Sequence, residues 1–139
     1  MTTKELCRIW KLRADLAKLH EQRAELRSTA RRLSCPPMDG MPRGRGGVNR
    51  RTENYAAKLA DLDKEIRKKD LQILREETRV QKFISTVPDA RLRLIIRHRV
   101  IDQMSWEKVA QAIGCRVETP AGVKQTLLRF MWEQEQNPT

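Results

Sequence analysis

A stripe of apolar residues near the N-terminus constrains the fold more than any other feature of this chain. The stripe residues recur in alternating steps of three and four, and they are Ile9, Leu12, Leu16, Leu19, Leu26, Ala30 and Leu33. Arg23 interrupts the stripe, and the positions between its members are mostly Arg, Lys, Glu and Gln. This spacing predicts one long helix over residues 3–33 with a coiled-coil seam, which needs a partner to cover it.

A second apolar stripe predicts another long helix over residues 52–87. Its residues are Leu59, Leu62, Ile66, Ile73, Val80 and Phe83 or Ile84, and it is interrupted by Lys69 and Glu76. Between the two stripes, residues 34–51 contain a Pro-Pro pair and four glycines and are strongly basic. We therefore expect an antiparallel helical hairpin over residues 1–87 with a basic loop at 34–51. Because a two-helix hairpin buries little apolar surface, we also expect a homodimer or a higher homo-oligomer.

The remaining segment, residues 88–139, predicts three shorter helices. Their expected starts are marked by Pro88 with Asp89, by Ser105, and by Thr119 with Pro120. Gly114 stands where a helix ends with a left-handed residue. The expected inward faces comprise Leu92, Ile95, Ile96 and Val100, then Trp106, Val109, Ala110 and Ile113, then Val123, Leu127, Leu128 and Phe130. The pattern predicts a helix-turn-helix domain and an all-α chain.

The charge balance favours a polyanionic partner. The chain has 29 Lys and Arg against 18 Asp and Glu, a net charge of +11, and most of the excess lies in residues 1–51. This excess favours nucleic acid over a membrane surface. The sequence has no P-loop, nucleophile-elbow or zinc-protease motif, and its His and Cys residues do not cluster. We therefore expect no enzyme, no catalytic residue, no cofactor and no metal site.

The sequence also predicts where the chain resides. It has no apolar run long enough to cross a membrane and no apolar stretch typical of a secretory signal at its start. Three widely spaced cysteines favour reduced thiols over a disulfide framework. We expect a cytoplasmic protein without a membrane partner.

The helix-turn-helix pattern indicates double-stranded DNA as the ligand, because the second helix of such a pair fits the major groove. The expected contacts at this helix are Thr119, Ala121, Lys124, Gln125 and Arg129, with Arg116 in the preceding turn contacting phosphate. The alternative is a three-helix bundle with a solvated polar face. Arg43 and Arg45 in the loop are a second candidate contact, or else a solvated surface.

Another basic pair lies at the start of the C-terminal segment. Arg93 and Arg97 share a helix face at i and i+4. They are candidates to contact the DNA backbone or an acidic protein partner, and the alternative is a solvated face paired with nearby carboxylates.

The C-terminal segment resembles region four of the sigma-factor superfamily. The resemblance rests on residues 105–114, Ser-Trp-Glu-Lys-Val-Ala-Gln-Ala-Ile-Gly, followed by Val123, Lys124 and Gln125. The whole chain is similar to phage and prophage proteins related to the ArpU/RinA-type regulators of late operons, including a Met-Pro-Arg-Gly stretch at residues 41–44.

This resemblance implies an all-α DNA-binding protein that controls transcription of phage genes in a bacterial host cell. The resemblance also implies host RNA polymerase as a candidate partner. The chain departs from the family at the start of the last helix, where the polar base-reading positions fall on Pro120, Ala121 and Gly122. The turn after Gly114 is also longer than the usual sigma-type turn.

Two other functions fit the same pattern. A phage DNA-packaging protein similar to a small terminase subunit also joins a helix-turn-helix to helices that oligomerise, in that case as a large ring. A protein-binding adaptor or inhibitor would instead use the hairpin to bind a host protein.

Overall fold

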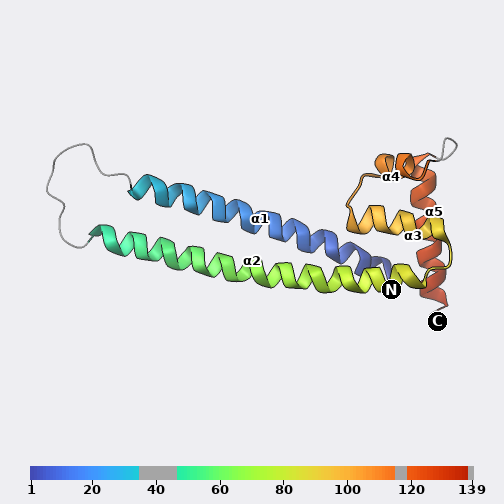
Figure 1. The fold of residues 1–139 in the computed structure, drawn as a ribbon, viewed down its shortest axis with the longest axis horizontal. Coiled ribbons are helices and arrows are strands. Elements are labelled where there is room, and N and C mark those ends of the chain that lie inside the picture. The colour runs from blue at the N-terminus through green and yellow to red at the C-terminus, as the bar shows by residue number, and fades with distance from the viewer. Residues whose placement is uncertain (35–46, 115–118, 138–139) are drawn as a thin grey trace. The chain divides into compact units, whose positions relative to one another are not determined.

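The computed structural model describes residues 1–34, 47–114 and 119–137, with side chains described for 1–32, 53–114 and 119–137. These residues form α1 (Thr3–Ser34), α2 (Gly47–Thr86), α3 (Ala90–Ile96), the π-helix η1 (Arg97–Ile101), α4 (Trp106–Ala112) and α5 (Pro120–Gln136), as Figure 1 shows. The described residues contain no strand. The predicted all-α fold, with a long helix pair followed by shorter C-terminal helices, is confirmed.

The chain divides into two compact units, each described by itself. Unit 1 comprises Met1–Arg13 and Gln72–Thr139, and unit 2 comprises Ala14–Leu71. Unit 1 therefore combines the first turns of α1 and the last turns of α2 with all of the C-terminal helices. This division differs from the boundary expected after residue 87. The reason is that the first turns of α1 and the last turns of α2 contribute buried residues to the core around α3, α4 and α5.

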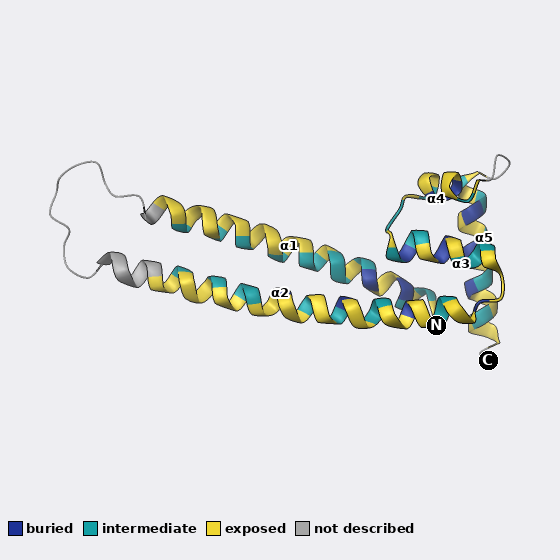
Figure 2. Ribbon diagram, viewed as in Figure 1, coloured by how far each residue is buried: buried dark blue, intermediate teal, exposed yellow. Residues whose placement is uncertain are grey.

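The core of unit 1 is built from six helical segments (Figure 2). Its buried members are Leu6, Ile9, Val80, Val87, Ile95, Ile96, Val100, Val109, Ala110, Val123, Leu127 and Met131. The rings of Phe83 and Phe130, with centroids 6.5 Å apart, pack at its edge. Most of the predicted inward residues of the C-terminal segment therefore meet in one core, and α1 and α2 complete it.

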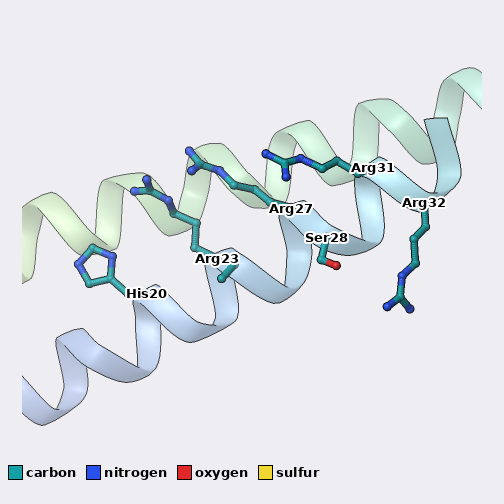
Figure 3. A pocket seen from close by; sticks show the side chains of 7 residues that line it. His20, Arg23, Arg27, Ser28, Arg31 and Arg32 are labelled. Atoms are coloured by element: carbon teal, nitrogen blue, oxygen red, sulfur yellow. The ribbon is translucent and has the colours of Figure 1, made fainter. Parts of the chain in front are cut away.

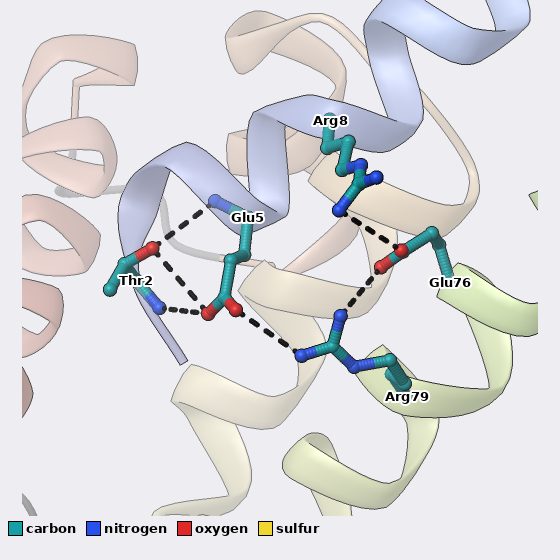
Figure 4. Close-up of polar contacts among 5 residues, drawn as sticks. All are labelled: Thr2, Glu5, Arg8, Glu76 and Arg79. Carbon is teal, nitrogen blue, oxygen red and sulfur yellow. Dashed lines mark hydrogen bonds and ion pairs between the residues drawn. The ribbon is translucent and has the colours of Figure 1, made fainter.

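A capping box starts α1 and is tied to α2 (Figure 4). The hydroxyl of Thr2 accepts a hydrogen bond from the Glu5 amide at 3.3 Å, and the Glu5 carboxylate accepts one from the Thr2 amide at 2.8 Å. Arg79 of α2 bridges Glu5 at 3.2 Å and Glu76 at 3.3 Å, and Arg8 pairs with Glu76 at 3.6 Å. The Thr2 amide, assisted by Arg79, holds the pKa of Glu5 below its ordinary value of 4.5, although burial acts in the opposite direction.

Further polar contacts within unit 1 join α1 to the C-terminal helices. The amide of Thr3 donates to Oε1 of Glu135 in α5 at 3.0 Å. Arg13 donates to the carbonyl oxygen of Ile101 at 2.7 Å and also pairs with Glu77 of α2. These contacts supplement the shared apolar core, so the first thirteen residues are an integral part of unit 1.

Each polar residue that interrupts a predicted stripe forms an ion pair across the hairpin. In unit 2, Arg23 pairs with Asp63 at 3.1 Å, and Lys69 pairs with Asp15 at 3.7 Å. In unit 1, Glu76 pairs with α1 as described above. In unit 2, the partner further along α1 pairs with the position further back along α2. In unit 1, Glu5 pairs with Arg79 and Arg8 pairs with Glu76, so the two helices run antiparallel, as predicted.

The start of α2 is the helix boundary that differs most from the prediction. α2 begins at Gly47, so residues 47–51, expected in the loop, belong to the helix. The physical reason is that no Gly or Pro follows Gly47 in this stretch, so nothing interrupts helix formation. Asp89 precedes α3 as its N-cap, and its carboxylate accepts a hydrogen bond from the Arg91 amide at 2.8 Å.

The π-helix η1 ends the helical run that starts at α3. The Asp102 amide donates to the carbonyl of Arg97 at 3.1 Å, and Nδ1 of His98 lies 2.9 Å from Oδ2 of Asp102. Gln103 then adopts a left-handed conformation, with φ of 54°. This turn redirects the chain from η1 into α4.

Candidate nucleic-acid interface

Helices α4 and α5 pack against each other, and a side-chain cap starts each of them. Oγ of Ser105 accepts a hydrogen bond from the Lys108 amide at 3.4 Å, and Oγ1 of Thr119 accepts one from the Gly122 amide at 3.2 Å. Gly114 follows α4 with a φ of +75°, a left-handed conformation that glycine adopts without steric cost. The predicted caps and the predicted left-handed glycine are confirmed.

The buried face of α5 follows a four-residue spacing. Val123, Leu127 and Met131 are buried. The prediction that Leu128 faces inward is wrong, because its side chain is 42% exposed. A helix turns by about 100° per residue, so a stripe through Leu127 and Met131 directs Leu128 to the side.

The predicted contact residues of α5 lie on its exposed side. They are Ala121, Lys124, Gln125 and Arg129. No described side chain forms an ion pair with Lys124 or Arg129, so both charges are available to an anionic ligand. Thr119 is exposed as well, but its hydroxyl is already engaged by the Gly122 amide.

The other predicted contacts have different surroundings. Arg93 is half-buried and donates to the carbonyl of Val87 at 3.1 Å, so it stabilises the start of α3. Arg97 in η1 is exposed. The predicted contacts Arg43, Arg45 and Arg116 lie outside the described residues.

The exposed side of α5 also presents two large apolar side chains that were not predicted there. Leu128 is 42% exposed and Trp132 is 62% exposed. Together with Lys124 they recur every four residues along α5. This spacing is the sequence signal that would have placed all three on one face of the helix. α5 therefore offers a mixed surface of cations, an amide and apolar groups.

An apolar groove of about 370 Å³ borders this surface within unit 1. Its lining includes Cys7, Trp10, Arg99, Trp106, Lys124 and Leu128. The guanidinium carbon of Arg99 lies 4.3 Å from the Trp10 ring centroid and 4.7 Å from that of Trp106. The sequence pattern could not reveal this cluster, because its members lie far apart along the chain.

The described residues contain no group of three or more His, Cys, Asp or Glu side chains arranged to hold a metal ion. None of the described helices is both long enough and apolar enough to cross a membrane. Cys7 is exposed as a free thiol.

Comparisons with known proteins add no relative. No family model matches the chain, no curated protein matches it, and no solved structure matches it.

Proposed function

We propose that this protein binds double-stranded DNA through α5 and regulates transcription of phage or prophage genes. The observation that supports the DNA-binding part best is the placement of Lys124, Gln125 and Arg129. All three are exposed on a helix that packs against α4 with its opposite face buried. The regulatory part rests on the resemblance to region four of sigma factors.

The mechanism begins with electrostatic capture. A net charge of +11 attracts the phosphate backbone from a distance and produces salt-dependent, sequence-independent association. α5 then enters the major groove, where Lys124 and Arg129 reach guanine edges or phosphates and Gln125 pairs with adenine. α4 lies across the backbone, and exposed Arg97 is a further phosphate contact.

Self-association is the second part of the proposal. In unit 2, Ile66 is the single buried side chain among those described, although the seam of α1 and α2 is rich in leucine. A second copy packed on that seam would bury more of it. Two copies joined in this way would place two α5 helices on repeated DNA half-sites, and the resemblance adds host RNA polymerase as a further partner.

Fluorescence anisotropy with a labelled duplex tests the DNA contact. At low salt we expect Lys124→Gln/Arg129→Gln to weaken binding about tenfold, because each of the two exposed charges contributes roughly 0.7 kcal/mol and about 1.4 kcal/mol corresponds to a factor of ten. The matched control is Arg75→Gln/Lys82→Gln, which removes the same charge from exposed positions of α2 in unit 1. Equal affinity of both double variants would refute α5 as the groove helix.

Exposed Leu128 and Trp132 favour a protein-binding adaptor as the second candidate function. Failure of the wild-type protein to bind any duplex at low salt would support that function over DNA regulation. Mass photometry separates the packaging alternative, since a large ring supports packaging and a dimer supports regulation.

A further inference from the structure

A row of arginines follows one side of α1 in unit 2. Arg23, Arg27 and Arg31 are spaced four residues apart, and Figure 3 shows their guanidinium groups pointing to the same side of the helix. We call these three residues the arginine row. With His20, Ala24, Ser28 and Arg32 they line a hollow of about 540 Å³.

The concentration of positive charge in the arginine row acts against the helix that carries it. Like charges at i and i+4 repel and oppose helix formation. Arg23 pairs with Asp63 of α2 at 3.1 Å. Glu21 and Glu25 lie on the same helix, yet neither forms an ion pair within the described part of the chain. A phosphate backbone along the row would offset this repulsion in addition to the interactions that Arg23 and Arg31 already make within the protein.

We propose that the arginine row binds the phosphate backbone of duplex DNA, at a site separate from α5. Successive arginines are about 6 Å apart along a helix that rises about 1.5 Å per residue, which suits a ligand with closely spaced charges. Guanidinium groups bind phosphate in a bidentate manner, and the Ser28 hydroxyl adds a hydrogen-bond donor to the same hollow.

The lining of the hollow favours nucleic acid over an anionic membrane. A helix that lies in a membrane interface needs bulky apolar side chains beside its cations. Among the residues whose side chains the structure describes, the lining is composed of arginines, a histidine, a serine and Ala24. This inference extends the proposed function, because it adds a second contact to the same class of ligand.

The test compares duplex affinity and its salt dependence for the full-length protein. We expect Arg27→Gln/Arg31→Gln to weaken binding about tenfold at low salt. The slope of log K against log salt should fall by about 0.9 for each phosphate that the variant no longer neutralises. The control, Arg67→Gln/Lys68→Gln, removes two exposed charges from α2 in unit 2 and should leave the slope nearly unchanged. Circular dichroism checks helix content, and Arg27→Gln alone replaces the double variant if that one unfolds.

The outcomes separate this inference from the proposed function. Weakening by the arginine-row variant but not by Lys124→Gln/Arg129→Gln would support this site and refute α5 as the groove helix. The opposite result would overturn this inference and leave the proposed function intact. Unchanged duplex binding together with loss of binding to phosphatidylserine-containing vesicles would also overturn it, in favour of a lipid surface.

Discussion

The guanidinium of Arg99 lies over the indole ring of Trp10, with 4.3 Å between the guanidinium carbon and the ring centroid. This contact joins the first turns of α1 to η1. The indole of Trp106 lies 4.7 Å from the same guanidinium, whose Nη1 donates to the carbonyl of Met104 at 2.7 Å. One side chain therefore connects α1, η1 and the start of α4.

Arg99→Ala should lower the free energy of unfolding by about 1–3 kcal/mol, because the substitution removes two cation–π interactions and one hydrogen bond. Urea denaturation followed by circular dichroism measures the change. Arg97→Ala is the matched control, since Arg97 is exposed on the same turn and its removal should change stability little. Equal effects of the two substitutions would show that the indole contacts do not stabilise unit 1.

Acidification should weaken the start of α1. The pKa of Glu5 is lowered in the folded protein, so its stabilising contribution is complete above the unfolded-state value and disappears as pH falls through the folded-state value. We expect wild-type protein to melt at a higher temperature than Glu5→Gln at neutral pH. The two melting temperatures should converge as pH falls well below 4.5. Parallel curves across that range would contradict a stabilising carboxylate.

Replacement of Gln103 by glycine should relieve backbone strain, and replacement by a β-branched residue should increase it. A residue with a Cβ atom is disfavoured at φ of 54°, whereas glycine is not. Gln103→Gly should therefore raise the free energy of unfolding by about 0.5–1 kcal/mol, and Gln103→Val should lower it by about 1 kcal/mol. Thermal denaturation of both variants gives the comparison. A loss of stability in the glycine variant would mean that the Gln103 side chain outweighs its strain.

The two faces of α5 should respond differently to truncation. Met131 is buried and Leu128 is exposed, although both are large apolar residues of one helix. Met131→Ala should cost about 2–4 kcal/mol of stability, while Leu128→Ala should cost less than about 1 kcal/mol. Chemical denaturation of both variants tests the assignment, and a larger loss from Leu128→Ala would reverse it.

Local sequence signals predicted local structure well. Helix caps at Ser105 and Thr119 and the left-handed Gly114 depend on a few neighbouring residues, and all three are confirmed. The capping box of Thr2 and Glu5 carries the same kind of signal, a Thr followed three residues later by a Glu, but it was not among the predicted caps.

Contacts between distant segments were harder to predict. Arg23 and Lys69 look like defects in their own stripes, and their role depends on Asp63 and Asp15 of the other helix. The prediction for Leu128 was wrong because an apolar face that contains Leu127 can be widened to its neighbour Leu128 or continued one turn later at Met131. Packing against the other helices of unit 1 selects Met131.

Unit 1 is discontinuous along the chain, and this affects the order in which it can form during synthesis. Leu6 and Ile9 leave the ribosome before their core partner Met131, which follows after more than a hundred residues. Unit 2 lies entirely within the intervening stretch, so its helices can pair earlier. Assembly of unit 1 must therefore await release of α5, and a fragment beginning after α2 would lack part of its own interior.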